Sequence, residues 1–143
     1  MLIIVLYLFS DDFVRMKSIP KPVLMALYSL FGQTAPETFR LLDRKCVTRI
    51  QCEKTKRICF RVKSADKNSL EIFYVFPKSW RCSCGIWTFH TLTQEKNITC
   101  KHVLATKICQ AILEVSENDQ CPYMKKEIIK NEKTFIQLFA EIN

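Results

Sequence analysis

Three cysteines and one histidine near the centre of the chain have the types and spacing that suit a metal ion. Cys82 and Cys84 are separated by one residue; after fifteen more residues come Cys100 and His102, also separated by one residue. Zinc in proteins takes four sulfur or nitrogen ligands in tetrahedral geometry. Because residues i and i+2 of an extended segment point to the same side, Cys82 and Cys84 can both face one ion. The spacing therefore predicts one zinc ion bound by four side chains.

The predicted zinc site is structural rather than catalytic. A catalytic zinc keeps one position open for water, whereas these four ligands fill the coordination shell. No glutamate stands two residues after a histidine, as the HxE sequence of zinc deaminases requires. The chain has only two glycines, Gly32 and Gly85, and neither of the glycine-rich nucleotide-binding patterns. We therefore expect a protein that is not an enzyme.

The eight cysteines also allow a different interpretation, a secreted domain cross-linked by disulfides. Against it, a CxC pair cannot easily bridge itself, and disulfides do not explain a histidine two residues after a cysteine. His90 is the rival imidazole, and we interpret it as structural. The cysteines without metal spacing are expected in the core or as inert surface thiols: Cys46, Cys52, Cys59, Cys109 and Cys121.

Positive charge is concentrated in one part of the chain. The formal net charge is +8, and ten basic residues lie between Arg40 and Lys67 against three acidic ones. Such a field attracts nucleic acid or an acidic partner, and a solvated strand face is the alternative. The candidate nucleic-acid contacts are Arg49, Lys54, Lys56, Arg57, Arg61 and Lys63.

The elements that must position these residues indicate an α+β fold. An apolar segment covers residues 1–18; its run of nine apolar residues is too short to span a membrane and lacks the basic start of a signal peptide. Helices are expected at 23–31 and from Thr34, followed by a small antiparallel sheet with strands near 46–52, 58–63 and 70–76. A helix over 102–115 follows the metal motif. After a linker, the apolar stripe of 125–142 predicts a C-terminal helix.

The motif resembles that of a known family. CxC-xn-CxH is the pattern of the SWIM-type zinc finger, and Cys100 to Ala105 reads CxHxxA, which resembles the longer motif of SWIM-domain subunits of the Shu complex. Tyr28 to Gly32, and Ala35 to Arg44, are similar to the region that precedes the finger in that family. The resemblance covers about residues 19–115, with a finger core at 72–113, and leaves the C-terminal region 116–143 outside.

This resemblance implies a role in homologous recombination DNA repair in the nucleus. The family member pairs with a RecA-like recombinase paralogue and promotes assembly of the recombinase filament on single-stranded DNA, without being an enzyme. The resemblance implies Cys82, Cys84, Cys100 and His102 as zinc ligands and Ala105 as a motif position whose small side chain allows close helix packing. The alternative function is a direct nucleic-acid-binding zinc module that uses the basic stretch 40–67.

Overall fold

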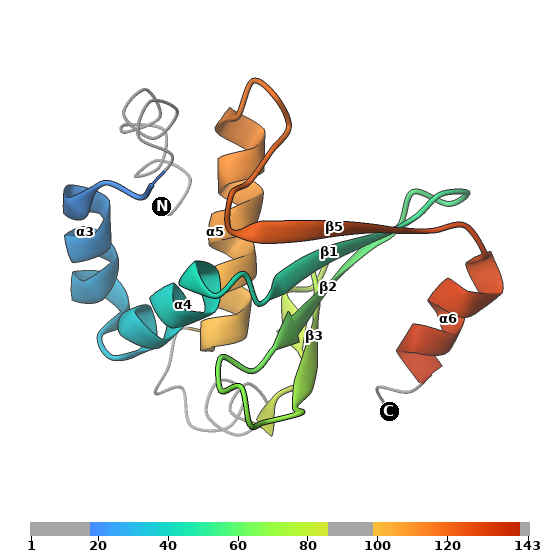
Figure 1. Cartoon of the computed structure of the whole chain (residues 1–143), viewed down its shortest axis with the longest axis horizontal. Coiled ribbons are helices and arrows are strands. Elements are labelled where there is room, and N and C mark those ends of the chain that lie inside the picture. Colours follow the sequence, from blue (N-terminus) through green and yellow to red (C-terminus); the bar gives the residue numbers. More distant parts are fainter. Residues whose placement is uncertain (1–17, 86–98, 141–143) are drawn as a thin grey trace.

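The structure is a computed structural model that describes residues 18–85 and 99–140. Within these residues the fold is α+β, as the sequence predicts, with four helices and one five-stranded mixed sheet (Figure 1). The expected apolar segment 1–18 lies almost wholly outside the described residues, as does His90. No helix in the described ranges is both long and apolar enough to cross a membrane.

Two short helices come before the sheet. Helix α3 spans Lys21–Phe31 and begins where Pro20 and Pro22 fix the backbone, a favourable arrangement for a first turn. It ends at Gly32, whose positive φ of 57° suits a residue without a side chain. Helix α4 spans Thr34–Asp43 and buries one face. The predicted end of the first helix at residue 31 is therefore confirmed.

The strands are arranged in the order β4-β3-β2-β1-β5. Their bounds are Val47–Cys52 for β1, Ile58–Lys63 for β2, Ile72–Phe76 for β3, Arg81–Cys82 for β4 and Met124–Ile129 for β5. The pairs β1–β2, β2–β3 and β3–β4 are antiparallel. The first two pairs join the three strands that the sequence predicts, whereas β4 is an additional strand. Strand β5 instead pairs in parallel with β1, so that the sheet is mixed.

The C-terminal region differs from the single helix expected over 125–142. Its first part is strand β5, and helix α6 begins only at Glu132 and spans Glu132–Ala140. The apolar residues of this segment suggested one helical stripe, but pairing with β1 satisfies the backbone groups of both strands. Lys130 and Asn131 separate the two elements. The Asn131 side chain accepts a hydrogen bond from the backbone N–H of Lys133 (2.9 Å), as at a helix start. Residues 141–143 lie outside the described part.

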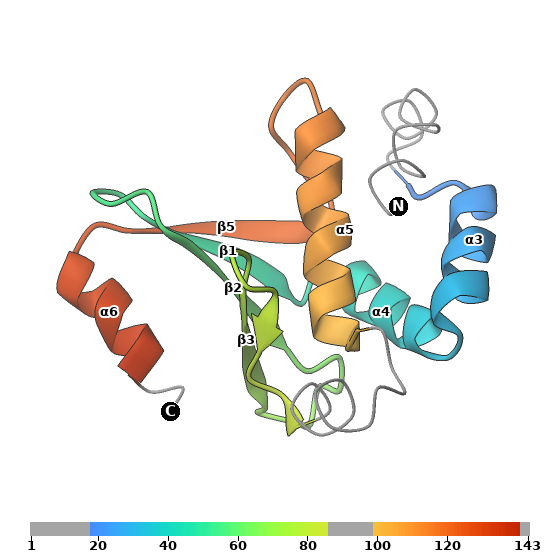
Figure 2. The same ribbon diagram turned by 180° about the vertical axis from the view of Figure 1, so that it is seen from behind.

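Helices cover both faces of the sheet. The main core lies between one face and helices α3, α4 and α5, and α5 spans Lys101–Val115. A smaller core lies on the other face, where Phe135 of α6 packs with Ile50, Cys52 and Cys59. Figure 2 shows α5 next to the strands, with α4 and then α3 farther out. The main core therefore joins the start of α5 to strands β3 and β4, where the metal motif lies.

Candidate metal centre

The first half of the motif lies along the edge strand of the sheet. Cys82 is in β4 and pairs with Val75 of β3, and the backbone N–H of Ser83 donates to the carbonyl of Tyr74 (3.0 Å). Cys84 follows in the bend after β4, and its sulfur lies in the same cluster as that of Cys82, as the spacing predicts. Both are buried in the main core, facing α5.

The second half of the motif lies at the start of helix α5. Cys100 is the N-cap residue, and its sulfur accepts a hydrogen bond from the backbone N–H of Val103 (3.4 Å). The unpaired N–H groups and the positive dipole end of a helix favour a thiolate at this position. His102, in the first turn, is 3% exposed and points back toward the strands.

The fold brings the four predicted residues together. The ligand atoms of Cys82, Cys84, Cys100 and His102 all lie within 4.8 Å of one another, and all four side chains are buried. The Cys82 sulfur is 3.8 Å from Nδ1 of His102. Two ligands of a tetrahedral zinc are about 3.6 Å apart, from bond lengths of about 2.3 Å to sulfur and 2.0 Å to nitrogen. The cluster is therefore compatible with one zinc ion.

Burial and contact with one another disfavour the thiolate form of the thiols in this cluster. Contact with Cys100 and Cys84, followed by burial, raises the pKa of the Cys82 thiol. The hydrogen bond with Cys82 lowers the pKa of Cys100, but contact with Cys84 and burial together outweigh it and raise the pKa to about 11. Zinc binds thiolates, and its charge offsets the cost of ionising them in a buried place. The donor set thus fits a zinc ion that cross-links β4 to α5.

Helix α4 supports the start of α5. The hydroxyl of Thr38 donates to the carbonyl of Thr34 (2.8 Å) and lies 3.4 Å from the carbonyl of Lys101. Lys101 also forms an ion pair with Glu37 (3.5 Å). These contacts link α4 to Lys101, which lies between the candidate ligands Cys100 and His102. The sequence does not indicate the contacts of α4 with Lys101. It could have suggested only the hydrogen bond between Thr38 and Thr34, because these residues are four positions apart in a predicted helix.

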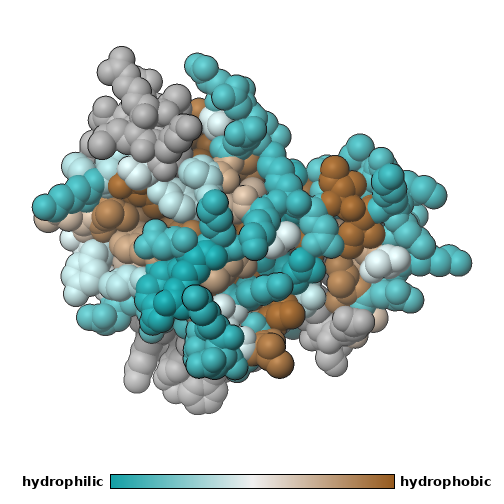
Figure 3. Space-filling view, in the orientation of Figure 1, coloured by the Kyte–Doolittle hydropathy of each residue, from teal (hydrophilic) through white to brown (hydrophobic). Residues whose placement is uncertain are grey.

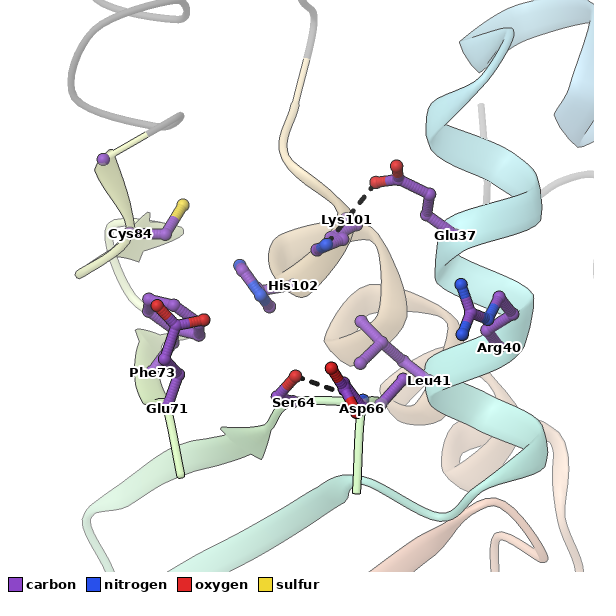
Figure 4. A pocket seen from close by; sticks show the side chains of 12 residues that line it. Glu37, Arg40, Leu41, Ser64, Asp66, Glu71, Phe73, Cys84, Lys101 and His102 are labelled. Atoms are coloured by element: carbon purple, nitrogen blue, oxygen red, sulfur yellow. Dashed lines mark hydrogen bonds and ion pairs between the residues drawn. The ribbon is translucent and has the colours of Figure 1, made fainter. Parts of the chain in front are cut away.

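An aromatic side chain of the sheet completes the surroundings of the cluster. The Phe73 ring lies against the His102 imidazole, with centroids 4.4 Å apart. Both residues line a pocket of about 470 Å³ that opens beside the cluster, and Figure 4 shows Phe73, Cys84 and His102 converging on it. Four of its charged side chains are exposed, namely Glu37, Arg40, Asp66 and Glu71, whereas Lys101 is half-buried. The sequence does not single out Phe73, because its place in an apolar strand suggests only a core residue.

The structure separates the six candidate nucleic-acid contacts. Lys54, Lys56 and Arg57 are exposed in the turn between β1 and β2. Arg61 and Lys63 of β2 are on the face of the sheet that α6 partly covers, whereas Arg49 of β1 points to the opposite face and donates to Gln51 (3.2 Å). Ala105, the small motif residue, is fully buried in the main core. The other five cysteines are all buried free thiols.

Several known proteins are similar in sequence to this chain. Residues 75–111 match the SWIM zinc finger. The chain is 30% identical over 94 residues to zinc finger SWIM domain-containing protein 7 from Homo sapiens. The aligned region covers 66% of this chain and 64% of the human protein. It is 29% identical to the Danio rerio protein of the same name over 98 residues, covering 68% and 67%. A homolog from Dictyostelium discoideum is 22% identical over 114 residues, covering 78% and 71%. The chain thus spans less than two thirds of the human relative.

Proposed function

Because this chain is a SWIM zinc finger protein homologous to zinc finger SWIM domain-containing protein 7, we propose that it is a non-enzymatic, zinc-binding subunit of a Shu-type complex. In this proposal it pairs with a RecA-like recombinase paralogue in the nucleus and promotes assembly of the recombinase filament in homologous recombination DNA repair. The observation that carries the proposal is the buried cluster of Cys82, Cys84, Cys100 and His102 within a sequence that resembles this family.

The nature of the metal centre supports a structural role within such a complex. Four buried protein ligands leave no coordination position for a substrate. The sequence has neither glycine-rich nucleotide loop, so that ATP chemistry in the proposed complex belongs to the recombinase paralogue. The contribution of this chain is then a fixed surface, which the metal holds in shape.

Helix α3 offers an apolar surface of the kind that a protein partner buries. Its inner side chains Val23 and Leu27 are in the main core, but Met25, Tyr28 and Leu30 are 62%, 49% and 40% exposed. Hydrophobic residues are also visible at the surface over the end of β5 nearest α6 (Figure 3), and Ile128 and Ile136 of these elements are 65% and 51% exposed. We place the partner on α3, because the resemblance to the family includes Tyr28 and Leu30 and excludes β5 and α6.

Purification of the tagged full-length chain from its native cells tests the proposal. We expect a RecA-like ATPase to co-purify in a defined ratio, and recombinase foci after DNA damage to fall when the chain is depleted. Tyr28→Glu should weaken co-purification while zinc content stays unchanged, and the matched change Ile136→Glu, at a similarly exposed apolar site, should not. Normal recombinase foci in depleted cells would contradict the recombination role, and a chain excluded from the nucleus would contradict the proposed location.

A further inference from the structure

The face of the sheet next to α6 gathers polar and charged residues from four strands into one row. The register pairs Thr48 of β1 with both Lys125 of β5 and Arg61 of β2, and Arg61 in turn pairs with Tyr74 of β3. Paired residues point to the same face of a sheet. Strands are about 4.8 Å apart, so the row is about 14 Å long.

This face is positively charged. Exposed Lys63 is two residues after Arg61 in β2 and therefore points to the same face. Exposed Arg81 of β4 pairs with Phe76, which also belongs to this face. The strands contribute four cations to the face but a single carboxylate, Glu127, which pairs with Arg61 (2.6 Å). On the opposite face, by contrast, Lys126 pairs with Asp119 (3.2 Å). Two of the cations, Arg81 and Lys125, lie outside the basic stretch 40–67.

Aromatic and apolar side chains lie between these cations. Tyr74 and Phe76 are half-buried and pack at the border of the small core formed with α6. Ile72, which pairs with Lys63, is 46% exposed. Cations beside aromatic rings on one surface are the combination that binds single-stranded nucleic acid, because phosphates pair with the cations and unpaired bases stack on the rings. Bases within a duplex are already stacked on each other and cannot use such a ring.

We propose that this face binds single-stranded nucleic acid, with Lys63, Arg81 and Lys125 as phosphate contacts and Tyr74 as a stacking platform. Arg61 holds the row together through Glu127 and adds positive charge. The inference extends the direct-binding alternative and is independent of the proposed protein partner, since it uses the face of the sheet opposite the helices α3, α4 and α5. With three to four phosphate contacts, log affinity should fall with log salt with a slope of about −2 to −3.

Fluorescence anisotropy of the zinc-loaded full-length chain with a labelled oligothymidine of about 20 nucleotides tests this proposal. We expect Lys125→Glu to weaken binding about tenfold at low salt. Lys21→Glu makes the same charge change at an exposed site on α3, and it should change affinity less than twofold. Tyr74→Leu should weaken binding about tenfold while the salt slope stays unchanged, and Glu127→Gln should strengthen binding.

Several results would overturn the proposal. These are absence of binding at 50 mM salt, equal losses for Lys125→Glu and Lys21→Glu, or duplex binding as tight as single-strand binding. Competition by polyglutamate as effective as by oligothymidine would instead identify an acidic protein segment as the occupant. The Lys125→Glu variant keeps its α3 surface and should still co-purify with the RecA-like ATPase. Loss of nucleic-acid binding in this variant would therefore not contradict the proposed protein complex.

Discussion

The aromatic ring of Phe73 lies against the imidazole of His102, with ring centroids 4.4 Å apart and planes inclined by 32°. One residue belongs to β3 and the other to the first turn of α5. Phe73 therefore covers the ring of a candidate ligand and restricts its orientation. The contact makes the position of the metal centre depend on the sheet as well as on its four donor atoms.

Replacing Phe73 with alanine should loosen the metal centre without removing a donor. His102 would lose the ring that fixes its orientation, and residues that orient metal-binding histidines typically affect affinity about 10- to 100-fold. We expect zinc transfer to a colorimetric chelator to become about tenfold faster or more. Phe73→Leu keeps most of the packing volume and should show a smaller effect. Equal transfer rates for Phe73→Ala and the unchanged protein would contradict this role.

Removing one cysteine of the cluster should release the metal and destabilise the fold. Structural zinc contributes about 10–16 kcal/mol of binding free energy in small zinc-finger peptides, so that Cys100→Ala should lower the melting temperature strongly. Elemental analysis should find one zinc per unchanged chain and less than a tenth of that in the variant. Cys46→Ser is the matched control, because this thiol lies outside the cluster and donates to the carbonyl of Ser64 (3.8 Å), a bond that serine can also make. Full zinc content in Cys100→Ala would exclude Cys100 as a ligand.

The link between α4 and α5 should contribute measurably to stability. Thr38 is fully buried, and its hydroxyl is within reach of carbonyls from both helices. Thr38→Val retains the shape but loses the hydroxyl, which should cost about 1 kcal/mol. Urea unfolding of the zinc-loaded protein measures this loss, and Thr38→Ser, which retains the hydroxyl, should lose less. If Thr38→Val costs nothing while Thr38→Ser destabilises the protein, the methyl group rather than the hydrogen bond carries the effect.

The sequence alone was sufficient to predict the cluster because its information is local. Cys82 and Cys84 at the end of a strand, and Cys100 and His102 at a helix start, are each separated by one residue, so that local backbone geometry arranges each pair. Strands β1 and β2, and the end of helix α3 before Gly32, were predictable for the same reason. The alternation of apolar residues in a strand and the positive φ of a glycine after a helix both depend on a few neighbouring residues.

Long-range pairing could not be predicted in this way. The parallel pairing of β5 with β1 joins segments about 75 residues apart, and nothing near Met124 indicates which strand it will meet. The stacking of Phe73 on His102 and the row from Lys125 to Tyr74 depend on the same tertiary arrangement. The basic stretch 40–67 likewise gave no indication that Arg49 and Arg61 point to opposite faces, until the strand register was known.

Cys59 should resist thiol reagents in the native protein, although it is a free cysteine. Its side chain is fully buried beside Phe135, and burial raises its pKa to about 11. A raised thiol pKa means that the neutral form persists to higher pH, so that at pH 8 only about one molecule in a thousand carries the reactive thiolate. Alkylation of Cys59, followed by mass spectrometry between pH 7 and 9, should be very slow and accelerate about tenfold per pH unit. Unfolding the protein should restore the rate of an ordinary thiol, whereas rapid labelling in the native state would show that α6 does not cover this part of the sheet.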